Sequence, residues 1–196
     1  MKDFIFYFKI GWSHIMGLDA TDHLFFIAVL AIIYTIADWK KVLVLVTAFT
    51  IGHALTLFMG AMNLFRINSA LVEFAIPCTI LITALSNLIL QKEKKRNLML
   101  QYTLALGFGL VHGLGYANYI RMMLSSDQNM VWGLFSFNVG LEAGQLIVVL
   151  MVLSVVWVAS ALHSNAHKYL VRLVSMAVLG FSLLMAIERF PFWHHA

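Results

Sequence analysis

The sequence predicts an all-α integral membrane protein, a bundle of about six transmembrane helices in one polytopic domain that covers residues 1–196. Composition is the first reason, because 62% of the residues are hydrophobic and 11% are charged, against roughly 45–50% and about 25% in soluble domains. The mean hydropathy of +0.88 agrees with this class. The second reason is that several apolar runs are long enough to cross a bilayer as helices, and none alternates like a barrel strand.

The apolar runs set the expected helices, which lie at about 21–37, 42–62, 69–90, 98–122, 131–161 and 168–188. Ahead of them, residues 1–10 mix Lys2, Asp3 and Lys9 with aromatic residues. This mixture is typical of a short amphipathic N-terminal segment at the membrane interface. It lacks the apolar core and the small-residue cleavage site of a signal peptide.

Basic residues are distributed unequally between the two sides of the predicted bundle. Eight lie on the side of the first, third and fifth connections: Lys40, Lys41, Lys92, Lys94, Lys95, Arg96, Lys168 and Arg172. Five lie on the other side: Lys2, Lys9, Arg66, Arg121 and Arg189. The positive-inside rule makes the richer side cytoplasmic, so both termini are expected to face outward. The pI near 9.3 then reflects topology and anionic lipid headgroups, and nucleic acid is not expected as a partner.

Ionisable side chains lie where hydrocarbon makes them costly. Such residues usually face a partner, a cavity or an ion, because an isolated charge in the bilayer costs several kcal/mol. His14, Asp22 and His23 lie at the expected outer rim of the first helix. His53 and His112 come about 12 and 14 residues into helices that run the same way, which places both rings roughly 18–20 Å from the cytoplasmic face.

A polar stripe and two glycine pairs mark the fourth and fifth expected helices. Asn138, Glu142 and Gln145 are spaced i, i+4 and i+7, so they share one helix face, with Glu142 near the expected midplane. GxxxG patterns at 109–113 and 140–144 let helix backbones approach closely in lipid. We therefore expect these two helices to form the tight centre of the bundle.

Imidazoles and carboxylates together in a dry environment favour a transition-metal site. Neutral imidazole binds nickel, cobalt, zinc and copper, and carboxylates complete such sites. Cys78 is the single cysteine, so a thiolate site is not expected. The expected metal ligands are His14, Asp22, His23, His53, His112 and Glu142. Asp22 could instead orient His23 without touching the ion.

Simpler roles exist for most of these side chains. Asp22 can cap the helix that it begins, and His53 can bond to a neighbouring helix, as intramembrane histidines often do. Glu142 can be protonated and bonded to Gln145 or to a neighbouring helix. The remaining polar residues are explained more simply as helix caps, solvated ends, loops or bonds between helices: Asp19, Asn87, Glu73, Asn138, His163 and His167.

Four segments around these residues form a recognisable pattern. They are His14…Asp22-His23-Leu-Phe-Phe, Thr47…Gly52-His53-Ala-Leu, Gly107…Val-His112-Gly113 and Phe137-Asn138…Glu142-Ala-Gly-Gln145. The pattern resembles the HupE/UreJ family of small bacterial membrane proteins, and the likeness covers the first five expected helices. The interval between His14 and Asp22 is longer than in the better-characterised branch, so the chain looks closer to a less characterised one.

The resemblance implies a nickel or cobalt permease that is associated with metalloenzyme maturation. It implies a multi-pass protein of the bacterial cytoplasmic (inner) membrane. By the same match, a metal-handling role is expected for His14, Asp22 and His23, and also for His112.

Three functions fit these observations. A permease would take up a divalent cation (nickel, cobalt or zinc) from the outer side, with the ion and the membrane lipids as its partners. An intramembrane zinc hydrolase would hold zinc with three histidines and use Glu142 or Asp22 as a base, but the chain lacks an HExxH helix, so we favour transport. A structural ion or hydrogen-bond network would instead stabilise a scaffold for another copy of the chain or another membrane protein. Few polar residues continue a route inward: Thr47, Ser86, Asn87, Thr103 and Ser154.

Overall fold

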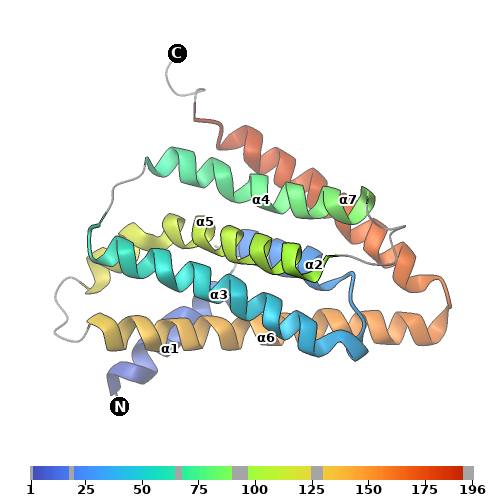
Figure 1. Cartoon of the computed structure of the whole chain (residues 1–196), viewed down its shortest axis with the longest axis horizontal. Helices are drawn as coiled ribbons and strands as arrows, with labels where there is room; N and C mark the ends of the chain where they lie inside the picture. Colours follow the sequence, from blue (N-terminus) through green and yellow to red (C-terminus); the bar gives the residue numbers. More distant parts are fainter. Residues whose placement is uncertain (1, 18–19, 65–67, 90–96, 125–129, 192–196) are drawn as a thin grey trace.

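A computed structural model describes residues 2–17, 20–64, 68–89, 97–124 and 130–191 (Figure 1). Helices make up almost all of these residues, and the described part of the chain contains no strand. The elements are α1 (Lys2–Met16), α2 (Thr21–Ala31), the short 3₁₀ helix η2 (Ile36–Asp38), α3 (Trp39–Ala61), α4 (Ser69–Ile89), α5 (Leu98–Leu124), α6 (Met130–Leu162) and α7 (Ala166–Glu188).

Within the described residues, the five helices from α3 to α7 are long and apolar enough to cross a membrane. The helices α1 and α2 pass the same test only as a pair that bends by 70°, so the number of spans is six when this pair counts as one. The predicted all-α membrane bundle of about six spans is therefore confirmed. The short N-terminal segment ahead of the first predicted helix is itself helical and continues to Met16.

The first predicted helix ends early. The apolar run extends to residue 37, but α2 ends at Ala31 and the chain turns before η2. The Thr35 hydroxyl donates to Asp38 Oδ2 at 3.0 Å, in a capping box that begins the next helix. His167 Nε2 donates to the carbonyl oxygen of Ile32 at 2.9 Å, which links the end of α2 to α7. The polar Thr35–Asp38 pair inside the apolar run therefore ends one helix and begins the next, which runs in the opposite direction.

The long helices alternate in direction. The end of the bundle where α3, α5 and α7 begin is also the end where α2, α4 and α6 finish (Figure 1). The basic residues at the starts of α3 and α7 lie at that end: Lys40, Lys41, Lys168 and Arg172. This arrangement agrees with the predicted topology, in which alternate connections share one side, while the orientation in the membrane stays a prediction.

Glycines bring α3 and α5 into backbone contact. A Cβ atom at Gly109 would collide with the carbonyl oxygen of Phe49, and one at Gly113 would collide with that of His53. From the α3 side, a Cβ at Gly52 would collide with the carbonyl oxygen of Leu106. Residue numbers rise together along this contact, so α3 and α5 run parallel.

A second backbone contact joins α1 to α6. A Cβ at Gly11 would collide with the carbonyl oxygen of Phe137, and a Cβ at Gly140 with that of Phe8. The helices expected at 98–122 and 131–161 therefore each make a tight backbone contact, but with different partners. Each GxxxG pattern predicts a close-packing face correctly, but α5 uses it against α3 and α6 uses it against α1.

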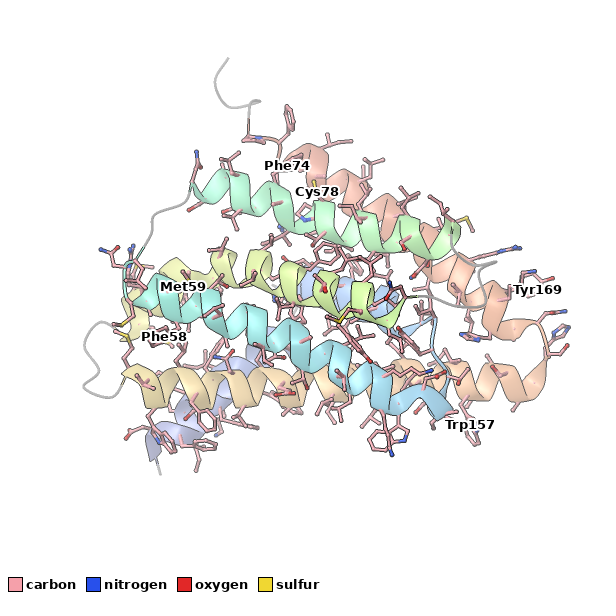
Figure 2. All side chains as sticks on the ribbon, in the orientation of Figure 1. Phe58, Met59, Phe74, Cys78, Trp157 and Tyr169 are labelled. Carbon is pink, nitrogen blue, oxygen red and sulfur yellow. The ribbon has the colours of Figure 1, made fainter. Side chains whose placement is uncertain are left out.

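The helix α2 is enclosed by the other helices, since it packs against α4, α6 and α7 as well as α1 and α3. The pair α4 and α7 packs together at one edge of the bundle (Figure 1). Large side chains such as Trp157 and Tyr169 point away from the bundle (Figure 2). An outward apolar surface of this kind is expected of helices that face lipid.

We expect Gly109→Ala to destabilise the bundle, because its Cβ would meet the backbone of α3. The loss should be about 1–3 kcal/mol, as for other overpacked sites, and is measured as a lower Tm of the purified protein in detergent. Gly107→Ala on the same helix is the matched control, since a Cβ there meets nothing within 4 Å. Equal Tm values for the two variants would contradict the proposed helix contact.

Candidate metal centre

Three histidines from three helices meet inside the bundle. His14 lies in the last turn of α1, His23 in the first turn of α2 and His53 within α3. Each offers a ring nitrogen such that the three atoms lie within 4.8 Å of one another. The bend between α1 and α2 creates this cluster, because it turns two imidazoles that are nine positions apart toward the same point.

The three imidazole rings lie close together. Ring centroids are 4.8 Å apart for His14 and His23, 5.7 Å for His23 and His53, and 6.1 Å for His14 and His53. Zinc–nitrogen bonds of about 2.0–2.1 Å place tetrahedral ligand atoms roughly 3.4 Å apart. Side-chain movements of roughly 1 Å would therefore close these three nitrogens on an ion.

The imidazole nitrogens lack protein partners. His14 Nε2, His23 Nε2, His112 Nε2 and both ring nitrogens of His53 are buried without a hydrogen-bond partner. An unpaired buried polar atom costs about 1–3 kcal/mol, and here several occur together in an apolar bundle. Such a group is stable when a ligand or water supplies the missing bonds, so this concentration points to an occupant.

Hydrogen bonds set the tautomers of two of the rings. His23 Nδ1 donates to Asp22 Oδ1 at 3.0 Å, and His112 Nδ1 donates to the carbonyl oxygen of Phe108 at 2.8 Å. In both rings the proton on Nδ1 leaves the lone pair of Nε2 free. A histidine that ligates a metal is normally held in this way by a carboxylate or a carbonyl group.

The Asp22 carboxylate connects the cluster to the last helix. Its Oδ2 lies 3.7 Å from Arg189 Nη1, just beyond the end of α7. The same carboxylate accepts from the backbone N–H of His23 at 2.8 Å, so it also satisfies a free amide of the first turn of α2. The N-cap residue of α2 is Ala20. Asp22 therefore orients His23 more directly than it caps the helix.

Aromatic side chains enclose the imidazoles. Tyr116 lies 4.1 Å from the His14 ring between centroids, and Phe26 lies 5.4 Å from His112. Phe49 lies 6.0 Å from His23. These neighbours keep the site dry and restrict the rotation of the rings.

These aromatic residues were not among the site residues expected from the sequence, although their spacing from the histidines is visible in it. Each lies three or four positions from a histidine on its own helix: Phe26 from His23, Phe49 from His53 and Tyr116 from His112. Residues at this spacing share a helix face. Arg189 gave no such signal, because the last helix brings it to Asp22 from the far end of the sequence.

The structure unites residues that the sequence placed at two depths. His14 and His23, expected at the outer rim, lie in one cluster with the deeper His53. His112 adjoins it, with its ring centroid 5.1 Å from that of His23. His53 lies beside the Asn138 side chain of α6, so the interaction with a neighbouring helix that the sequence allowed involves this residue.

Glu142 is not brought into the histidine cluster. Its Oε1 accepts from the Thr47 hydroxyl at 2.7 Å, and Thr47 lies about two helical turns before His53 on α3, roughly 9 Å along the axis. Glu142 thus bonds to a neighbouring helix, which is one of the simpler roles that the sequence allowed, while Gln145 Oε1 accepts from Thr50 at 2.8 Å. Glu142 and the histidines therefore form two separate polar groups.

Other polar candidates lie away from the cluster. Glu73 is exposed on α4, as expected of a solvated end residue. His163 is exposed, and its Nδ1 accepts from the backbone N–H of Asn165. Asn87 bonds between helices, donating to the carbonyl oxygen of Val29 at 2.6 Å. Asp19 lies outside the described residues.

The donor set consists of neutral nitrogen ligands with an oriented carboxylate behind one of them. Imidazole suits nickel, cobalt, copper and zinc, whereas magnesium and calcium prefer oxygen ligands. Three converging nitrogens leave room for a further donor, since such ions take four or more ligands. The chemistry of the site therefore suits a divalent transition metal.

Comparison with known proteins identifies the family of the chain. Neither the search of curated proteins nor the search of solved structures found a match. A family model described as HupE / UreJ protein matches residues 1–189, nearly the whole chain and all of the helices described above. The chain therefore belongs to the HupE/UreJ family of membrane proteins, a family associated with nickel and cobalt transport.

Proposed function

We propose that this protein is a permease for a divalent transition metal of the nickel, cobalt or zinc type. The observation that carries the proposal is the cluster of His14, His23 and His53, whose ligand atoms lie within 4.8 Å and include buried nitrogens without a protein partner. Family membership supports the same function, because the family is associated with nickel and cobalt transport.

The residues around the cluster have distinct roles in this proposal. His14, His23 and His53 bind the ion. His112 supplies a further nitrogen, because its Nε2 is buried and unpaired while its Nδ1 is engaged by Phe108. Asp22 holds the His23 ring with its free nitrogen toward the ion, and its negative charge favours a cation nearby.

Access to the site is from the side of His14. This residue is partly exposed, whereas His53 and His112 are buried. Arg189 lies beside Asp22 on the same approach. In the predicted topology this is the outer side, so the ion enters from the periplasm and reaches His14 first.

Transport is favoured over hydrolysis by the state of the two carboxylates. A zinc hydrolase needs a general base beside the ion, yet Asp22 is bonded to His23 and Glu142 is bonded to Thr47. Polar residues also continue from His53 along α3 and α6, as a route would require. Three histidines with an open position would also suit a catalytic zinc. A permease has to release its metal, whereas a hydrolase keeps its zinc. The rate at which bound metal exchanges therefore distinguishes the permease from the hydrolase.

We expect the purified protein to bind one Ni²⁺, Co²⁺ or Zn²⁺ per chain. The His53→Asn variant should bind that metal more than about 100-fold more weakly, because removing a direct ligand costs more than removing a residue that only orients a ligand. Isothermal titration calorimetry and elemental analysis measure this. His163→Asn is the matched control, since His163 is exposed outside the cluster. Unchanged affinity in His53→Asn would exclude the cluster as the metal site.

We expect Asp22→Asn to keep the cluster but to bind metal about 10–100-fold more weakly, as is usual when the partner of a ligating histidine is changed. The amide loses the charge that holds the Nδ1 proton of His23. The same titration provides the measurement, with Asp38→Asn as control, because Asp38 bonds to Thr35 and Lys41 instead. A loss as large as in His53→Asn would instead make Asp22 a direct ligand.

Proteoliposomes that contain the protein should take up radioactive or dye-reported Ni²⁺, Co²⁺ or Zn²⁺ in a saturable manner. The His23→Asn variant should reduce the rate to that of empty vesicles, because His23 binds the ion next to Asp22. Bound metal should exchange with a chelator. A stoichiometric zinc that resists chelation, together with no uptake, would favour the hydrolase or a structural ion over the permease.

A further inference from the structure

The interface between α3 and α6 is polar inside an otherwise apolar bundle. The Thr47 hydroxyl donates to Glu142 Oε1 at 2.7 Å, and the Thr50 hydroxyl donates to Gln145 Oε1 at 2.8 Å. Thr50 also donates to the carbonyl oxygen of Val46 at 3.1 Å. By contrast, the contact of α3 with α5 is made of glycines against backbone. Polar residues therefore follow one particular face of α3.

This polar interface begins at the histidine cluster. Thr50 and Thr47 lie one and two helical turns before His53 on α3, which is about 4.5 and 9 Å along the axis. On α6, Asn138 lies beside His53, and Glu142 follows one turn later on the same face. The residues define what we call the polar seam: His53, Thr50, Thr47, Asn138, Glu142 and Gln145.

The polar seam keeps an unused hydrogen-bonding group in its interior. Gln145 Nε2 is buried without a partner, and the Gln145 side chain is 0% exposed. Groups that only joined two helices would be fully paired, because an unpaired buried amide is costly. The Asn87 amide on α4, which donates to Val29, is an example of such a joining residue.

The donor chemistry changes along the polar seam. Nitrogen ligands converge at His53, whereas Thr47 and Glu142 present oxygen atoms. Oxygen ligands hold nickel, cobalt or zinc less strongly than imidazoles do, since these metals favour nitrogen. An ion that leaves the histidines for Glu142 would thus be bound more weakly, by a carboxylate that still balances its charge.

We propose that the polar seam is the inward half of the metal path, and that Glu142 with Thr47 forms a second cation site, separate from the histidine cluster. This inference rests on the proposed permease function. The ion passes from His53 past Asn138 and Thr50 to the Glu142 carboxylate, and Gln145 lies about one turn further inward on α6. In the predicted topology this direction leads toward the cytoplasmic side, where α3 begins.

The experiment compares binding with uptake in the full-length protein. Glu142→Gln and Thr47→Val should leave Ni²⁺ affinity at the histidine cluster within about twofold of the wild type. Ni²⁺ uptake by proteoliposomes should fall about tenfold or more, the effect expected when one charge-assisted interaction is lost. Thr47→Ser, which keeps the hydroxyl, should restore uptake. Thr83→Val is the matched control, because the Thr83 hydroxyl donates within its own helix to Thr79.

Each outcome decides the proposal. Normal uptake by Glu142→Gln and Thr47→Val would overturn the second site. A parallel loss of affinity and uptake in folded protein, shown by an unchanged Tm, would place Glu142 in the primary site and also overturn it. If the wild type neither binds nor transports metal, the permease function itself fails, which is a distinguishable result. If Glu142→Gln does not fold, the comparison of Thr47→Val with Thr47→Ser still gives the answer.

Discussion

The backbones of α3 and α5 touch because glycine removes the Cβ atoms between them. The positions of the imidazoles depend on this contact and on the similar glycine contact between α1 and α6. Gly113 packs against the backbone of His53, next to His112 on α5. Gly144 packs against Ile15, next to His14 on α1. A helix pair separated by larger side chains would hold these rings farther apart, and the three ligand nitrogens could not converge.

Burial then determines what the converged rings can do. Aromatic neighbours surround them, so an unpaired ring nitrogen has little water to bond with. The carbonyl of Phe108 and the carboxylate of Asp22 each take an Nδ1 proton and direct a free Nε2 lone pair inward. A neutral set of imidazole nitrogens in a dry environment is the kind of donor set that transition metals prefer.

The bend between α1 and α2 brings two of the imidazoles together. Because α1 and α2 meet at 70°, the first span presents His14 at the end of one helix and His23 at the start of the next. Irregular backbone is tolerated at membrane depth where it lines a site or is covered by protein. Here α2 is enclosed by neighbouring helices, and α6 covers α1. The polar seam on α3 and α6 then continues from the opposite side of the cluster.

Local pattern was enough to predict the all-α membrane class and helices close to α3, α4, α5, α6 and α7, because apolar run length is a property of each segment alone. It also identified His14, His23 and His53, since an ionisable residue in hydrocarbon needs a partner. Only tertiary packing decided which glycine face meets which helix, that Glu142 bonds to Thr47 apart from the histidines, and that Arg189 lies at Asp22. Those outcomes depend on distances between segments remote in sequence, and periodicity within one helix carries no information about its partner.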